Sequence, residues 1–313
     1  MTLNLELMPP ERFDAWRTAT ITRFASFRRE SGMRPPKEAE EEATGILSSR
    51  FPDGIQSQWQ EVLEVRDDRS VVGSAWLEVR ERDGAVRAML YDLRAEDPAA
   101  ALPLIEARAA AMGAATLQID LFAQDSDSWA AIDGRGYRAL NVQMLLAPLP
   151  APRPVAGVRL ERMTAEQYAG FEEQLITEFA DDLVKEGQSS PEAARVESER
   201  QTAESLPEGV DTEDELLFVA YTDGVDEPVG VLWLSVERRS NGAHVFVLEL
   251  RVDAAYRRRG YGAAIMRAAE DTSRQVGATS IGLHAFGSNE AARALYRSLG
   301  YREAEVLLGK EIS

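Results

Sequence analysis

The stretch VDAAYRRRGYG, residues 252–262, decides the fold of the second half of this chain. It follows an apolar, β-like run at 244–252 and opens into a segment at 261–276 whose apolar side chains recur at helical spacing. Two glycines one residue apart let backbone approach a ligand closely, and a helix N-terminus attracts anions. Arginines beside them add charge-assisted hydrogen bonds to phosphate oxygens. The loop therefore predicts a polyphosphate site.

Two common phosphate-binding loops do not fit this stretch. A dinucleotide loop needs a third glycine, where this chain has Ile265, and an acidic residue at the end of the next strand. That strand, expected at 280–284, ends without a carboxylate. A P-loop needs a Gly-Lys-Ser/Thr run, and residues 252–262 contain no lysine.

The pattern that fits is Arg/Gln-x-x-Gly-x-Gly/Ala, present as RRRGYG at 257–262. It resembles the acetyl-CoA signature of the GNAT family of N-acetyltransferases, and SNEAARALYRSLGY at 288–301 looks like a later motif of the same family. The resemblance implies acetyl-CoA as the acyl donor and co-substrate. It also implies direct attack by an amine, which belongs to a small molecule, a peptide or an amino-terminus. Fold analogy does not convey which amine is used.

The resemblance also implies the site residues. Tyr296 would be the general acid that protonates the departing CoA sulfur, with a core aromatic as the alternative. Glu249 stands where many relatives hold a catalytic carboxylate, and its alternative is an ion pair with Arg251 or a neighbour. The residues expected to contact the cofactor are Leu250, Arg251, Val252, Arg257, Arg258, Arg259, Gly260, Tyr261, Gly262, Asn289, Ala292 and Tyr296.

Local structure bears on the roles expected for Asn289 and Glu249. Asn289 precedes a helical pattern, so a helix cap alone also explains its residue type. Strand alternation places Val247, Glu249 and Arg251 on one face of the strand before the loop. Glu178, Asp181 and Asp182, on the first expected helix of the second half at 164–186, either line the acceptor pocket or form a solvated face, and the solvated face is the plainer interpretation.

The chain contains two copies of one unit. Residues 72–79 resemble 229–236, and 89–94 resemble 246–251, both at a spacing of 157 residues. Nearer the start of each copy the spacing is 155, and after the loop it is 164. The change from 157 to 164 places a seven-residue deletion in the first copy, at the position of the phosphate loop.

The first copy has therefore lost the phosphate loop. Asp125 and Ile132 stand at the positions of Asn289 and Tyr296. We expect a degenerate GNAT-like domain without a cofactor loop at 1–147, a Pro-rich linker at 148–156 and a GNAT domain with the acetyl-CoA site at 157–313.

Each copy should have an α/β fold, a twisted, mostly antiparallel mixed sheet flanked by helices. Helices are expected at 10–30, 35–50, 98–112, 126–135, 164–186, 191–206, 261–276 and 289–299.

Composition excludes several function classes. A net charge of −18 argues against nucleic acid as a partner. No apolar run approaches the length of a membrane span, and the chain has no cysteine and two histidines, so we expect no membrane and no metal. The expected state is a cytoplasmic monomer or homodimer. A non-catalytic acyl-CoA sensor and a scaffold protein remain the alternatives to an enzyme.

Overall fold

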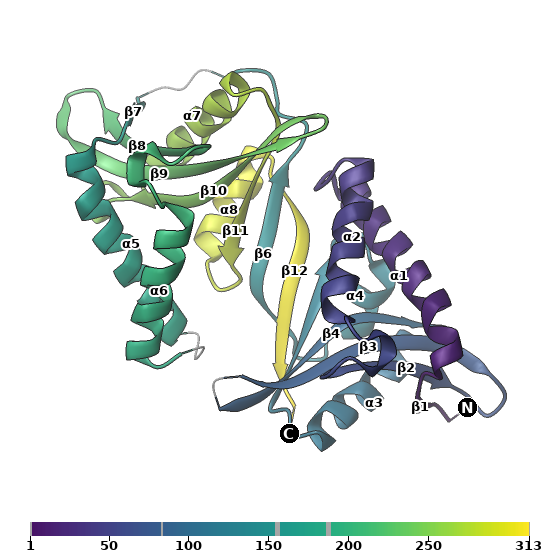
Figure 1. The fold of residues 1–313 in the computed structure, drawn as a ribbon. Coiled ribbons are helices and arrows are strands. Elements are labelled where there is room, and N and C mark those ends of the chain that lie inside the picture. The colour runs from purple at the N-terminus through teal and green to yellow at the C-terminus, as the bar shows by residue number, and fades with distance from the viewer. Residues whose placement is uncertain (1, 83, 154–156, 186–188, 313) are drawn as a thin grey trace. The chain divides into compact units, whose positions relative to one another are not determined.

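The computed structural model describes residues 2–82, 84–153, 157–185 and 189–312. It consists of two compact units, drawn in Figure 1. Unit 1 comprises Met1–Leu145, His284–Arg293 and Arg302–Ser313, and unit 2 comprises Leu146–Leu283 and Ala294–Tyr301. Unit 1 therefore draws on both halves of the sequence, whereas unit 2 comes almost entirely from the second half. The part of the expected linker at 154–156 lies outside the described residues.

The two halves of the sequence repeat one order of elements, as the duplication predicts. The first half contains β1 (Asn4–Leu7), α1 (Pro10–Ser31), α2 (Pro36–Arg50), η1 (Gly54–Gln56), β2 (Gln60–Arg66), β3 (Val71–Arg82), β4 (Ala85–Ala95), α3 (Pro98–Ala111), β5 (Thr116–Phe122), α4 (Ser126–Ile132) and β6 (Arg138–Leu146). The second contains β7 (Arg159–Arg162), α5 (Ala165–Lys185), α6 (Pro191–Ser205), η2 (Gly209–Asp211), β8 (Glu215–Thr222), β9 (Val225–Arg239), β10 (Gly242–Val252), η3 (Ala254–Tyr256), α7 (Tyr261–Gln275), β11 (Ala278–Phe286), α8 (Glu290–Leu299) and β12 (Arg302–Glu311).

All eight expected helices are confirmed, and their starts follow local chemistry. Four of them, α1, α2, α3 and α6, begin with proline in the first turn, where the missing N–H has no helical partner to lose. Ser190 caps α6 by accepting a hydrogen bond from the backbone N–H of Ala193. Among the described residues, no helix is long and apolar enough to cross a membrane.

The fold is mixed α/β, and most neighbouring strands are antiparallel, as expected. In unit 1 the hydrogen-bonded order is β1-β2-β3-β4-β5-β12-β6, and in unit 2 it is β11-β10-β9-β8-β7. The parallel pairs are β4 with β5 and β10 with β11. In unit 2, α5 and α6 cover one face of the sheet and α7 covers the other (Figure 1).

The last strand of the chain belongs to unit 1. β12 lies between β5 and β6 and is antiparallel to both. Its inward residues Ala304, Val306 and Leu308 are at most 5% exposed. The second copy thus supplies a central strand to the unit built mainly by the first copy.

Replacing Val306 with alanine should destabilise unit 1 by about 2 kcal/mol, since buried methyl groups are lost and a cavity remains. Trp16, Trp59, Trp76 and Trp129 lie in unit 1, so denaturant unfolding followed by tryptophan fluorescence in a Trp233→Phe background reports on that unit. Glu311→Ala, at the exposed end of the same strand, is the control. An unchanged unfolding midpoint for Val306→Ala would contradict the placement of β12.

Candidate active site

A β-bulge in β10 opens the sheet of unit 2. Val247 is paired with Leu234 of β9 and Glu249 with Trp233, so Leu248 has no partner between them. On the other side, the pairing of β10 with β11 runs from Ala243 to Val247 and stops there. The strand therefore separates from β11 at the bulge.

The bulge reverses which face the later residues occupy. Because directly paired residues share a face, Glu249 lies on the face of Trp233, whereas Val247 lies on that of Leu234. The expectation that Val247 and Glu249 share a face is wrong, because it assumed unbroken alternation. Arg251, paired with Val231, does share the face of Glu249.

The backbone beyond the bulge turns some of its polar groups away from β9. The N–H of Asp253 donates to the Val229 carbonyl of β9 at 3.0 Å, a distance typical of a hydrogen bond between paired strands. Alternation therefore turns the backbone groups of Val252 and Leu250 to the edge that β11 no longer pairs. The Val252 carbonyl there accepts a hydrogen bond from Arg257 Nε at 2.8 Å.

The glycine-rich loop ends in an uncapped helix N-terminus. Gly260 has φ 87°, a left-handed conformation that glycine adopts without strain, and no side chain caps α7. Gly262 lies in its first turn, where an added Cβ would stand 3.2 Å from Leu295 Cδ2. The first-turn N–H groups of α7 are thus left for a ligand rather than for the protein's own carboxylate.

The arginines of the loop are held by different contacts. Arg258 has φ 60°, which is uncommon for a residue with a side chain. The Arg259 guanidinium lies 5.8 Å from the ring centroid of Tyr256, and that ring packs edge-on against Tyr261 at 6.2 Å. The cluster is basic, exposed and adjacent to the helix N-terminus, which fits a phosphate-bearing ligand.

The corresponding helix of the first half is closed to such a ligand. Asp97 caps α3, where its carboxylate accepts a hydrogen bond from the Ala100 N–H at 2.9 Å. Pro98 removes a second donor from the first turn. A carboxylate at that position accepts a hydrogen bond from the helix N-terminus and repels a phosphate. The N-termini of α3 and α7 therefore differ in their affinity for anions.

Glu249 is a desolvated carboxylate in the second half. Burial raises its pKa to about 6; the nearby Arg251 opposes this, and the charges of Glu178 and Asp182 reinforce it. Within the described parts of the chain, Glu249 makes no ion pair. Arg251 instead donates to Glu178 Oε2 at 3.2 Å. The ion pair of Arg251 is therefore with Glu178 and not with Glu249.

In the first copy, the corresponding carboxylate forms an ion pair. Asp92, at the position of Glu249, is buried and forms an ion pair with Arg23 of α1. At the repeat spacing of 155, Arg23 corresponds to Glu178 of α5. The second copy thus has an anion where the first has the cation that neutralises its strand carboxylate.

Tyr296 is buried on α8, 8% exposed, and lies in unit 2 with Glu249. Burial, followed by the charge of Glu249, raises the pKa of its phenol to about 12. The hydroxyl therefore stays protonated across the physiological range and can donate. Its ring packs against Tyr301 with centroids 5.9 Å apart.

Asn289 and Ala292 belong to unit 1. Asn289 Oδ1 accepts a hydrogen bond from the Ala292 N–H at 3.1 Å, so the cap suggested by its sequence position is present. Its counterpart Asp125 caps α4 in the same way. The other residues of the predicted site, Leu250, Arg251, Val252, Arg257, Arg258, Arg259, Gly260, Tyr261, Gly262, Glu249 and Tyr296, lie in unit 2.

Comparisons with known proteins agree with this geometry. Residues 175–301 match the acetyltransferase (GNAT) family. Two uncharacterized N-acetyltransferases of Bacillus subtilis (strain 168) align with half of the chain. YycN is 27% identical over 155 residues, covering 50% of this chain and 99% of its own length. YdgE is 26% identical over 153 residues, covering 49% and 97%.

A solved structure that superimposes on this chain covers both of its halves. The GCN5-related N-acetyltransferase from Sphaerobacter thermophilus covers 99% of this chain and 96% of its own, with a TM-score of 0.54 at 18% identity. At that identity it supports the fold alone. The family match thus rests on residues 175–301, which are similar to the acetyltransferase (GNAT) family of transferase enzymes.

Proposed function

We propose that this protein transfers an acetyl group from acetyl-CoA to the amine of a small molecule, a peptide or an amino-terminus. The observation that carries the proposal is the unpaired carboxylate of Glu249, whose pKa of about 6 lies near neutrality. A general base works best when its pKa is close to the working pH. Glu249 meets that condition because burial raises its pKa, and no cation is ion-paired with it in the way that Arg23 is with Asp92.

The donor fits the loop of the second half. The uncapped N-terminus of α7 and Arg257, Arg258 and Arg259 would bind its pyrophosphate. Backbone groups of Leu250 and Val252, turned away from β9, would bond the pantetheine arm. The donor supplies the thioester. The first half, with Asp97 in the helix end, is proposed to keep the fold without binding the donor.

The side chains would divide the proton transfers between them. Glu249 would accept the proton that the ammonium group of the acceptor must lose before its nitrogen can attack. A backbone N–H beyond the bulge would polarise the thioester oxygen. Tyr296, still protonated because its pKa is raised to about 12, would donate a proton to the departing sulfur.

Calorimetric titration with acetyl-CoA should give one site per chain. Gly260→Asp places a carboxylate at the start of α7, as Asp97 does in α3, and should abolish binding by repelling the pyrophosphate. Gly260→Asn has nearly the same shape without the charge and is the matched control. Two sites per chain, or equal affinity in the two variants, would contradict a single pyrophosphate-binding site at the start of α7.

Glu178→Arg should rebuild the ion pair of the first copy in the second. The new cation would lower the pKa of Glu249 and fix its carboxylate, so kcat/KM should fall about a hundredfold. In the unaltered enzyme, kcat/KM should rise with pH through about 6 as Glu249 ionises. The assay is thiol release from acetyl-CoA with the most active amine of a panel.

Asp181→Arg is the control, because it makes the same charge reversal at an exposed neighbouring position. It should preserve both the rate and the pH profile. The base assignment fails if Glu249→Gln retains the rise near pH 6.

Tyr296→Phe should lower kcat about a hundredfold, because the departing sulfur loses its proton donor. Acetyl-CoA affinity, measured by calorimetry, should stay unchanged. Tyr301→Phe removes the same atom from the neighbouring ring and should leave kcat near the original value. Full activity in Tyr296→Phe would exclude the phenol as the acid.

A further inference from the structure

Unit 1 contains a cavity that the proposed reaction does not use. Its volume is about 240 Å³, and it is lined by residues of α1, α2, β4, β5 and β12. A buried water needs only about 10–15 Å³ on this measure, so the cavity has room for a small organic molecule. The lining residues are Phe24, Arg28, Ile46, Ser49, Arg50, Tyr91, Asp120, Phe122 and Glu305.

Two carboxyl groups form the acidic side of this cavity. Asp120 of β5 and Glu305 of β12 are hydrogen-bonded to each other across adjacent strands. Across the described residues, neither carboxyl makes an ion pair with an arginine or a lysine. Both are half-buried and reach the cavity wall. They are therefore available to a ligand.

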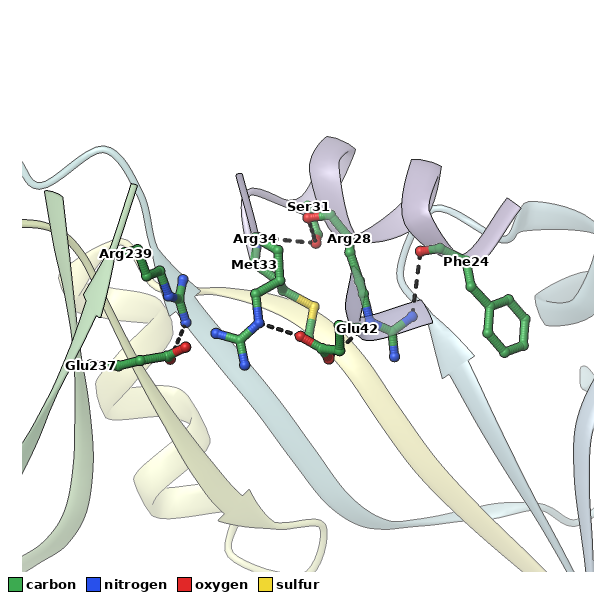
Figure 2. Close-up of polar contacts among 8 residues, drawn as sticks. All are labelled: Phe24, Arg28, Ser31, Met33, Arg34, Glu42, Glu237 and Arg239. Atoms are coloured by element: carbon green, nitrogen blue, oxygen red, sulfur yellow. Dashed lines mark hydrogen bonds and ion pairs between the residues drawn. The ribbon is translucent and has the colours of Figure 1, made fainter. Parts of the chain in front are cut away.

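The arginines of the lining already form ion pairs. Arg28 Nε donates to Glu42 at 3.0 Å, and its Nη1 donates to the Phe24 carbonyl at 3.3 Å (Figure 2). Arg50 Nη1 donates to Glu78 at 2.6 Å. Glu42 and Glu78 do not line the cavity. An anionic ligand would meet no unpaired cation here, whereas a cationic ligand would meet an unpaired acidic pair.

Aromatic rings form the rest of the wall. Phe24, Tyr91 and Phe122 line the cavity, and the negative face of an aromatic ring attracts a cation. The protein already uses all three rings in this way, with the Arg28 guanidinium 5.8 Å from the Phe24 centroid. The Arg28 guanidinium lies 4.9 Å from the Phe122 centroid, and that of Arg50 lies 5.1 Å from the Tyr91 centroid.

We propose that the cavity of unit 1 is a binding site for a small organic cation bearing a primary ammonium group. The ammonium group would lie against the carboxyl pair of Asp120 and Glu305, with a short aliphatic body along the rings of Phe24 and Tyr91. This site goes beyond the transfer reaction and does not depend on it.

The second copy does not share this chemistry. At the repeat spacing of 164, Asp120 corresponds to His284 and Glu305 corresponds to Asn141. The acidic pair is therefore not a remnant of a site common to both copies. It also depends on the strand arrangement of unit 1, because Glu305 comes from the last strand of the second copy.

Binding should release a proton. Burial and the charge of Asp120 raise the pKa of Glu305, with Arg28 opposing and Glu42 reinforcing the shift. Arg50 and the protonated Tyr91 are the other ionisable groups of the lining. Because the two carboxyls cannot easily ionise together, the empty pair holds one proton at neutral pH. An ammonium ion replaces that proton, so affinity should rise with pH.

The test is calorimetric titration of the full chain with n-butylammonium chloride, with pentan-1-ol as a neutral probe of similar size. Titrations at neutral pH in phosphate and in HEPES, which has no primary amine, should differ in enthalpy by the amount expected for release of about one proton. The variant is Asp120→Asn with Glu305→Gln, which keeps hydrogen-bonding groups of similar shape. Glu311→Gln removes the same charge from the exposed end of β12 and is the control.

We expect butylammonium to bind the original chain and Glu311→Gln alike, and the double variant at least about tenfold more weakly, without proton release. Thermal melts check that each variant folds. Binding that persists in the double variant but disappears in Glu249→Gln would place the cation in unit 2 and overturn the proposal. Equal affinity for pentan-1-ol, or no heat with butylammonium up to about 20 mM, would overturn it as well.

Discussion

The separation of β10 from β11 at Leu248 is the constraint on which the proposed site depends. One unpaired residue moves Glu249 to the face covered by α5 and frees the backbone edge of Leu250 and Val252. The first copy has the same irregularity, since Trp76 is paired with Asp92 and Leu77 with Leu90. The bulge is thus a property of the fold, and what each copy does with it depends on the side chains around it.

The internal duplication supplies a comparison that a single domain would lack. Both copies place a carboxylate after the bulge, but Arg23 neutralises Asp92 whereas Glu178 leaves Glu249 unpaired. Both copies start a helix after the same strand, but Asp97 fills one helix end and Gly260 leaves the other open. A charge reversal at one of these positions, and the replacement of an aspartate by a glycine at the other, therefore distinguish the two copies.

Much of this could be predicted from the sequence, because the signals were local. The helices follow from prolines, caps and apolar spacing, and the loop follows from its glycines and arginines. The bulge could not be predicted, because Leu248 continues an apolar run and no glycine marks it. The pairing of Arg251 with Glu178 joins residues 73 positions apart, and only the packing of α5 against the strand brings them together. The position of β12 was equally hidden, since its alternating pattern suits either copy.

The location of β12 in unit 1 has a consequence for the history of the chain. Because the terminal strand of the second copy completes the sheet of unit 1, the two copies are joined by strand pairing as well as by the linker. Once joined in this way, neither half can be lost or inherited alone without exposing an unpaired sheet edge. The first copy, although it lacks the phosphate loop, is therefore the structural partner of the last strand of the chain.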